Sequence, residues 1–130
     1  MRHFCLTAVV FLLSTLFAKA QNSRQSDDLT ERAAQLFEEK EFADAYPLYS
    51  QLVSLQPKDA DLNFRFGTCT IFSGESREDA IKHLIFAEKR GAEDIRLHYY
   101  LGKAYHLNYQ FEKAKTQYQT YLDGISPKEK

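Results

Sequence analysis

The sequence predicts an all-α fold in which one helix–turn–helix unit occurs three times. A period near 34 residues is the main observation, because earlier parts of the chain resemble residues 98–122, HYYLGKAYHLNYQFEKAKTQYQTYL. Small residues recur at this period in the first and the second predicted helix of each unit, namely Ala33, Gly67 and Gly102, and Ala45, Ala80 and Ala114. A constant period with small residues at helix crossings is typical of proteins built from stacked helical repeats.

The third unit carries the most complete pattern: Leu101-Gly102, then Tyr105, then Phe111 at the start of its second helix. This pattern resembles the tetratricopeptide repeat (TPR) family, although His98 stands where that family favours tryptophan. The resemblance implies a right-handed α-solenoid of six helices, with repeats over about 27–58, 59–92 and 93–124. The residues that match the repeat signature are Ala33, Ala45, Tyr49, Pro57, Gly67, Ala80, Gly102, Tyr105, Ala114 and Tyr118.

Residues 1–20 are typical of a cleavable signal peptide. Two basic or ionisable residues precede an apolar run over 4–17, and Ala18-Lys19-Ala20 has the small-x-small pattern of a signal peptidase site. A transmembrane anchor is the alternative, but the run is shorter than the roughly 20 residues that span a bilayer. We therefore expect an exported protein in the periplasm or at the outer membrane, with secretion less favoured and no transmembrane segment after cleavage. Residues 21–26 would form a flexible lead-in.

The first repeat should begin near Asp27 or Asp28, because carboxylates suit a helix N-terminus. Its second helix should cover about 42–56 and end at Pro57. Pro47 is then expected within the first turn and a half, where proline costs little in helix stability.

In the second repeat, Asp59 or Asp61 should cap a helix that ends around Phe72. Residues 76–79 resemble a helix start with an acidic first turn, and Gly91 can end that helix in the left-handed conformation.

The third repeat should comprise helices over about 93–108 and 111–123, with Gly124 ending the second helix. Residues 125–130 are expected to be a polar tail or the beginning of a linker. Solenoids usually end in a polar capping helix, and none follows here. Self-association, a partner or a downstream domain could therefore cover the last helix, where three large residues would be partly open: Tyr118, Tyr121 and Leu122.

The composition favours neither a nucleic-acid-binding protein nor an enzyme. The formal net charge is −1 with both signs interspersed, so no basic stripe is available for phosphates. No spacing typical of a metal site, a phosphate-binding loop or a catalytic triad occurs, and we expect no cofactor, no metal and no catalysis. Cys69 would be the only cysteine after cleavage, and we expect it to fill space in the core rather than to react.

The resemblance implies a concave groove lined by the first helix of each repeat, which in this family binds an extended peptide or a partner helix. The matching positions are Phe37, Phe64, Arg65, Thr68, Phe72, Tyr99, Tyr100, Lys103 and His106. One branch of the family grips a C-terminal carboxylate with a Lys/Asn/Asn/Lys/Arg set. This chain departs from that set, with Thr30, Ala34, Arg65, Arg96 and Tyr100 nearest those places.

The segments FADAYPLYSQLVSLQP and LHYYLGKAYHLNYQFEKAKTQYQTYL are also similar to the N-terminal TPR region of certain bacterial envelope proteins. Those proteins carry a β-propeller and a peptidoglycan-associated domain of the outer-membrane-protein-A type. The sequence thus predicts a noncatalytic scaffold in the cell envelope that binds a protein or peptide. A structural spacer at the N-terminus of a larger envelope protein is the alternative.

Overall fold

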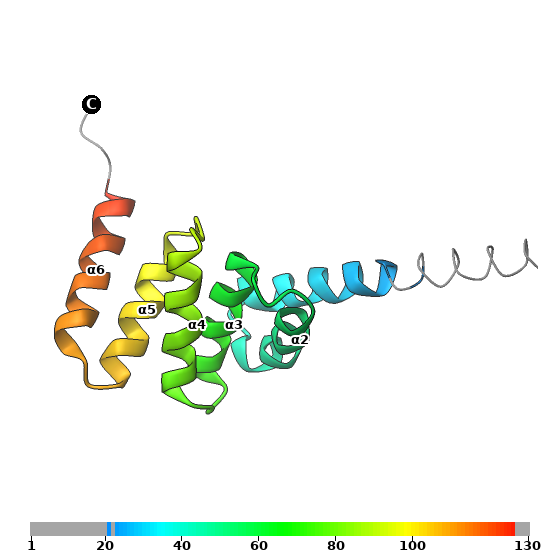
Figure 1. Cartoon of the computed structure of the whole chain (residues 1–130), viewed down its shortest axis with the longest axis horizontal. Helices are drawn as coiled ribbons and strands as arrows, with labels where there is room; N and C mark the ends of the chain where they lie inside the picture. Colours follow the sequence, from blue (N-terminus) through cyan, green and yellow to red (C-terminus); the bar gives the residue numbers. More distant parts are fainter. Residues whose placement is uncertain (1–20, 22, 127–130) are drawn as a thin grey trace, which may run out of the picture. The chain divides into compact units, whose positions relative to one another are not determined.

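A computed structural model describes residue 21 and residues 23–126, and these residues form an all-helical structure (Figure 1). The chain is helical over 23–38, and five further helices follow: α2 (Phe42–Leu55), α3 (Ala60–Phe72), α4 (Arg77–Lys89), α5 (Arg96–Leu107) and α6 (Phe111–Ile125). No strand occurs in this described part, and the predicted all-α class with six helices is confirmed. The expected signal peptide and the end of the polar tail lie outside the described residues.

The chain divides into two compact units, Met1–Arg32 and Ala33–Lys130. In the first unit, residue 21 and residues 23–32 are helical, so the expected lead-in is helix and the expected start near Asp27 or Asp28 is wrong. The segment contains neither glycine nor proline, so nothing in it interrupts a helix. None of the described helices is long and apolar enough to cross a bilayer.

In the second unit, each helix from α2 to α6 packs against the next one in the chain. α3 also contacts α5, the first helix of the following repeat. Figure 1 shows α3, α4, α5 and α6 as successive neighbours joined by short turns. This arrangement brings the first helices of the repeats to one side, where the candidate site lies.

Several helix ends follow the sequence-based expectations. The Asp59 carboxylate accepts a hydrogen bond from the backbone N–H of Leu62 at 2.8 Å and caps α3. Ser76 caps α4, and Gly91 follows that helix with a φ of +79°. Pro47 lies in the second turn of α2, close to where it was expected.

Two boundaries in the third repeat differ from expectation. α5 begins at Arg96 rather than near residue 93, because the Asp94 carboxylate accepts a hydrogen bond from the Arg96 backbone N–H at 2.9 Å. Gly124 was expected to stop α6, but the helix continues through it to Ile125. A β-carbon at position 124 would lie 2.8 Å from Cγ1 of Ile95, so this glycine allows α6 to approach the segment before α5.

The crossing glycines lie where helices meet most closely. A β-carbon at Gly67 would lie 2.8 Å from Cγ of Leu84, and one at Gly102 would lie 2.7 Å from Cδ1 of Tyr118. Contacts that short do not occur between real side chains, so only glycine permits these helices to pack at this distance. The remaining signature residues are buried, except for the exposed Pro57 and the half-buried Tyr118.

Aromatic side chains form much of the core near the first two repeats. The Phe37 ring contacts the edges of Phe42, Tyr49 and Phe64 with centroid distances of 5.3, 5.9 and 5.7 Å. Such edge-to-face pairs add to the stabilisation that burial of apolar area provides. Cys69 lies in α3 with no exposed surface, as expected for a core residue.

Candidate functional site

A groove of about 530 Å³ opens on the side of the first helices of the repeats. Its walls come from the end of the helix over 23–38, the turn that follows, the end of α3, α5 and the last turns of α6. The lining residues are Phe37, Glu38, Lys40, Phe42, Phe72, Arg96, Tyr99, Tyr100, Lys103 and Tyr121. The groove therefore draws on all three repeats.

Aromatic rings line one wall of this groove. Phe42 stacks on Phe72 with a centroid distance of 4.7 Å, and Tyr100 meets both rings at 5.7 and 6.3 Å. Tyr99 lies 5.5 Å from Tyr121 across the hairpin of α5 and α6. Phe72 and Tyr99 remain 38% and 39% exposed, so part of the aromatic surface is open to a ligand.

An ion-pair network also reaches this groove, through Glu38 and Arg96. The Arg96 guanidinium donates to both carboxylate oxygens of Glu38 at 2.9 and 3.0 Å, and to the Asp94 carboxylate at 2.7 Å. Arg65 lies 3.7 Å from Glu38 and donates to Asp61 at 2.8 Å. Both arginines stand over the Phe37 ring, at 5.0 and 5.5 Å from its centroid, which adds cation–π attraction.

The pKa values of the two acidic groups on Arg96 reflect this network. Hydrogen bonding from Arg96 holds the pKa of Glu38 below its ordinary value, against a smaller opposing effect of burial. Burial opposes ionisation of Asp94, but hydrogen bonds from the Arg96 side chain and backbone outweigh it and lower its pKa. The same bonds raise the pKa of Arg96. All three groups are therefore charged at neutral pH.

Two lysines at the edge of the groove have no such carboxylate partner. Within the described part of the chain, the ion pairs at this groove use Arg65 and Arg96, and neither Lys40 nor Lys103 takes part in one. The Lys103 ammonium lies 5.1 Å from the centroid of the Phe72 ring. The groove thus presents aromatic surface next to lysine charges that a ligand could neutralise.

The structure brings together five of the predicted groove residues: Phe37, Phe72, Tyr99, Tyr100 and Lys103. Phe64 and Thr68 were also predicted there, but both side chains are fully buried, so they belong to the core. The family's groove pattern placed them wrongly because these positions of α3 face the interior, where the Thr68 hydroxyl donates to the Phe64 carbonyl.

The remaining two predicted residues lie outside the groove lining. The Arg65 guanidinium lies over the Phe37 ring and forms ion pairs with Glu38 and Asp61. It also donates a hydrogen bond to the Tyr49 hydroxyl at 3.3 Å. His106 lines the hollow between α5 and α6, and it also lines a small pocket with Tyr99 and Lys103, two residues of the groove. Arg65 therefore lies outside the lining, whereas His106 adjoins the groove.

Five lining residues were not among the predicted groove positions: Glu38, Lys40, Phe42, Arg96 and Tyr121. Four of them lie at helix ends or in the turn after the first helix, where helical periodicity gives little guidance. The sequence did contain one signal for the ion pair. Residues 38 and 96 carry opposite charges and lie on the first helices of the first and third repeats. The sequence does not show that these helices come within ion-pair distance.

The described residues contain no group of three or more His, Cys, Asp or Glu side chains that could hold a metal ion.

Neither a protein-family model nor a curated protein matches the sequence. A solved structure does match: the second TPR domain of Spaghetti (RPAP3), bound to an HSP90 peptide with the sequence SRMEEVD. The TM-score is 0.62 at 20% sequence identity, over 78% of this chain and 94% of that chain. The fold of this chain is therefore similar to that of a TPR domain.

Proposed function

We propose that this chain is a noncatalytic protein–protein interaction scaffold that binds a peptide or a partner helix in its groove. The observation that carries the proposal is the groove itself, where half-exposed aromatic rings lie beside unpaired lysine ammonium groups. The peptide bound to the structural neighbour supports the same use of the fold.

The groove favours a particular kind of ligand. An apolar or aromatic side chain of the ligand would pack on the open faces of Phe72 and Tyr99, where it is removed from water. An acidic side chain would lie between or beside Lys40 and Lys103. Aromatic residues and cations are common among the residues that dominate binding energy at interfaces.

The location and the larger context are also part of the proposal. The N-terminal 20 residues support export, and the resemblance to envelope proteins supports the periplasm or the outer membrane as the destination. A structural spacer in a larger peptidoglycan-associated protein is the alternative function. It is favoured by the exposed apolar side chains on α6, which leave a surface for a neighbouring domain.

The direct test is selection of a random peptide library on the full chain, produced in an exporting host and purified as the host processes it. We expect selected peptides to combine an acidic with an apolar or aromatic residue. Their affinity, measured by fluorescence polarisation, should fall by about fivefold or more in Tyr99→Ala and in Lys103→Ala.

Lys113→Ala is the matched control. The Lys113 ammonium also lies over an aromatic ring, 5.5 Å from the centroid of Tyr105, but Lys113 does not line the groove. This variant should bind as the unaltered chain does. Equal loss in Lys103→Ala and Lys113→Ala, or no loss in either groove variant, would contradict the proposed site.

A further inference from the structure

The trough between α3 and α4 is filled by the following helix, α5. This helix contacts both members of the hairpin before it. The Tyr100 ring of α5 lies 6.4 Å from the ring of Phe64 in α3, measured between centroids. On the other side, the Arg77 guanidinium of α4 donates to the Leu107 carbonyl of α5 at 2.9 Å. A hairpin of this fold therefore accepts one helix between its two members.

The equivalent trough between α5 and α6, here called the α5–α6 trough, holds no helix of the described chain. Two hollows of about 250 and 430 Å³ lie along it, and they adjoin because His106 and Tyr118 line both. Five further lining residues carry the argument, namely Tyr99 and Lys103 of α5 and Phe111, Lys115 and Leu122 of α6.

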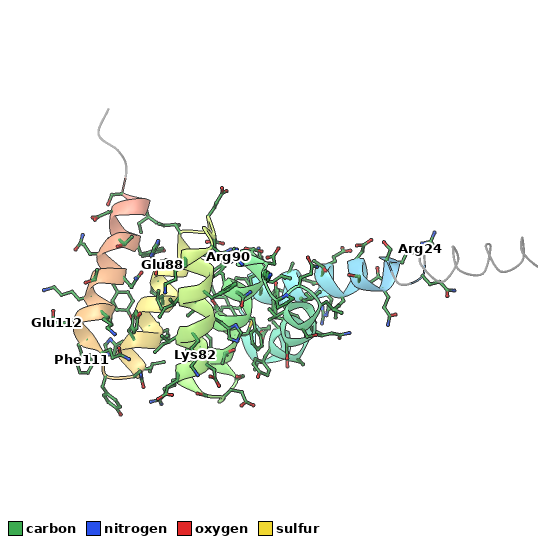
Figure 2. All side chains as sticks on the ribbon, in the orientation of Figure 1. Arg24, Lys82, Glu88, Arg90, Phe111 and Glu112 are labelled. Carbon is green, nitrogen blue, oxygen red and sulfur yellow. The ribbon has the colours of Figure 1, made fainter. Side chains whose placement is uncertain are left out.

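Equivalent residues are buried where a helix follows and exposed in the α5–α6 trough. Phe64 and Tyr99 each stand three residues before a crossing glycine, and they are 0% and 39% exposed. Phe42 and Phe111 each begin the second helix of a repeat. Phe42 stacks on Phe72 of the following helix and is 7% exposed, whereas Phe111 is 55% exposed. Figure 2 labels Phe111 in the first turn of α6, the last helix of the described chain. The exposed set is therefore the surface that a further helix would cover.

The buried face of α5 indicates what kind of helix fits such a trough. Apolar residues on this face recur at the i, i+3, i+4 and i+7 spacing of an amphipathic helix: Leu97, Tyr100, Leu101 and Ala104. A helix with this spacing would remove Phe111 and the 51% exposed Leu122 from water. The helices α2 to α6 already pack against one another, so the filling helix comes from outside the described chain.

The charge of the α5–α6 trough narrows the choice of helix. Lys103, Lys115 and His106 are its basic lining residues, and no described carboxylate lines either hollow. Neither lysine forms an ion pair within the described chain. Glu112 and Asp123 lie in a separate polar groove beyond Lys115. A second copy of this trough would bring the same basic residues, whereas a helix with acidic flanks would neutralise them.

We propose that the α5–α6 trough binds an amphipathic helix of a partner protein, in the position that α5 takes on α3 and α4. The apolar face of this helix covers Phe111 and Leu122, and carboxylates on its flanks pair with Lys103 and Lys115. The proposal goes beyond the peptide groove. Tyr99 and Lys103 line both sites, but Phe111, Lys115 and Leu122 line only the trough.

The probes are two synthetic helices of about 18 residues, which carry the apolar residues of α5 at their own spacing on an alanine-rich background. One has glutamates on the flanks of the apolar face, and the other has lysines there. Fluorescence polarisation with the full chain, as processed by an exporting host, measures both Kd values. We expect micromolar binding of the glutamate helix, because one helix in a trough buries less than a standard-size interface. The lysine helix should bind at least about tenfold more weakly.

Phe111→Ala and Leu122→Ala locate the bound helix. Each should raise the Kd of the glutamate helix about fivefold or more. Helical content should not change, because both side chains are half exposed in the single chain. Leu55→Ala, at a side chain that is 62% exposed on α2, is the matched control and should bind normally. Tyr121→Ala should also bind normally, because Tyr121 lines the peptide groove and not the trough.

A charge reversal addresses the flanks of the bound helix. Lys115→Glu should weaken binding of the glutamate helix and strengthen binding of the lysine helix, each by about threefold or more. Lys113→Glu is the matched control on the same helix. Its ammonium lies over the Tyr105 ring and does not line the trough, so this variant should change neither Kd by as much.

Equal binding of the two synthetic helices, or a Kd that is unchanged in Phe111→Ala and Leu122→Ala, would overturn the proposal. So would a loss in Tyr121→Ala alone, because the helix would then lie in the peptide groove. Sedimentation equilibrium of the chain without a helix should show a monomer. A dimer that Leu122→Ala weakens would assign this face to a second copy and would also overturn the proposal. Peptides selected on the groove should bind Phe111→Ala unchanged, so the two proposals can fail independently.

Discussion

Arg96 donates hydrogen bonds to both carboxylate oxygens of Glu38, at 2.9 and 3.0 Å, although the two residues are 58 positions apart in the chain. The same guanidinium binds Asp94, so its hydrogen-bonding capacity is largely used inside the molecule. Arg65 is similarly engaged by Asp61 and Glu38. The sequence resemblance predicted these arginines nearest the places where one branch of the TPR family binds a peptide carboxylate.

We therefore predict that the peptide SRMEEVD, bound by the structural neighbour, binds here no more tightly than its C-terminally amidated form. To bind Arg96, a free carboxylate would have to replace Glu38 or Asp94, which gains little. The acidic side chains of the peptide are available to Lys40 and Lys103 in both forms. Fluorescence polarisation of both peptides measures the difference. Glu38→Gln should strengthen the free-carboxylate form a few-fold by releasing part of Arg96, whereas Glu39→Gln at the neighbouring exposed position should not. A strong preference for the free carboxylate in the unaltered chain would contradict the prediction.

Gly102→Ala should destabilise the fold. The new β-carbon would lie 2.7 Å from Cδ1 and Cε1 of Tyr118, so α5 and α6 would have to separate. Overpacking of this kind costs about 1–3 kcal/mol, and the better helix propensity of alanine offsets up to about 1 kcal/mol. Urea unfolding followed by circular dichroism measures the change. Thr116→Ala on the exposed side of α6 should remain within about 0.5 kcal/mol. A more stable Gly102→Ala chain would show that the helices are not in close contact.

Cys69 should resist thiol reagents in the folded chain. Burial raises the pKa of its thiol to about 12, so the reactive thiolate is scarce at pH 8 and the sulfur is covered. Labelling with iodoacetamide, followed by peptide mass analysis to separate Cys69 from Cys5, measures the rate. We expect fast modification in urea. In buffer the rate should be at least about 100-fold lower, because the sulfur is accessible only in the small fraction of chains that is unfolded. Equal rates would show that α3 is open at this position.

Stability should fall as the pH drops below 6.5, and His83 is the expected cause. Burial lowers the pKa of His83 from its ordinary value of 6.5, with smaller opposing and reinforcing effects from Asp79 and Lys82. The unfolded chain then binds the proton first. The stability that the neutral ring provides is complete above pH 6.5 and is lost as the pH falls toward the lower folded value.

Urea unfolding across this pH range measures the effect. His83→Gln should flatten the profile between pH 6.5 and the range where carboxylates titrate, while it can still donate to Asn63, whose side-chain oxygen lies 2.8 Å from His83 Nδ1. His106→Gln, at an exposed position, should keep the slope. A slope that survives in His83→Gln would assign it to another group.

The helical class and the order of the helices were predictable because they depend on local features. The period of small residues at 33, 67 and 102 records where helices cross, and Asp59 and Ser76 are residues that cap helices in any context. One departure occurred where a distant contact changed a local preference. Gly124 would stop a helix in isolation, but in the folded chain it allows α6 to lie against Ile95.

The candidate site was predictable only in part, for the same reason. The resemblance to the TPR family implied that Phe72, Tyr99, Tyr100 and Lys103 line one groove, and these residues do line it. It could not show that Phe64 and Thr68 turn inward, because burial depends on the distance to the neighbouring repeat.

The sequence by itself determined the helices, their order and the small residues at their crossings, because these depend on propensity and spacing along the chain. The tertiary structure decided which charges meet and which apolar faces remain open. Glu38 pairs with Arg96, and Phe111 lacks the cover that Phe42 has, only because packed helices bring some distant positions together and leave others apart.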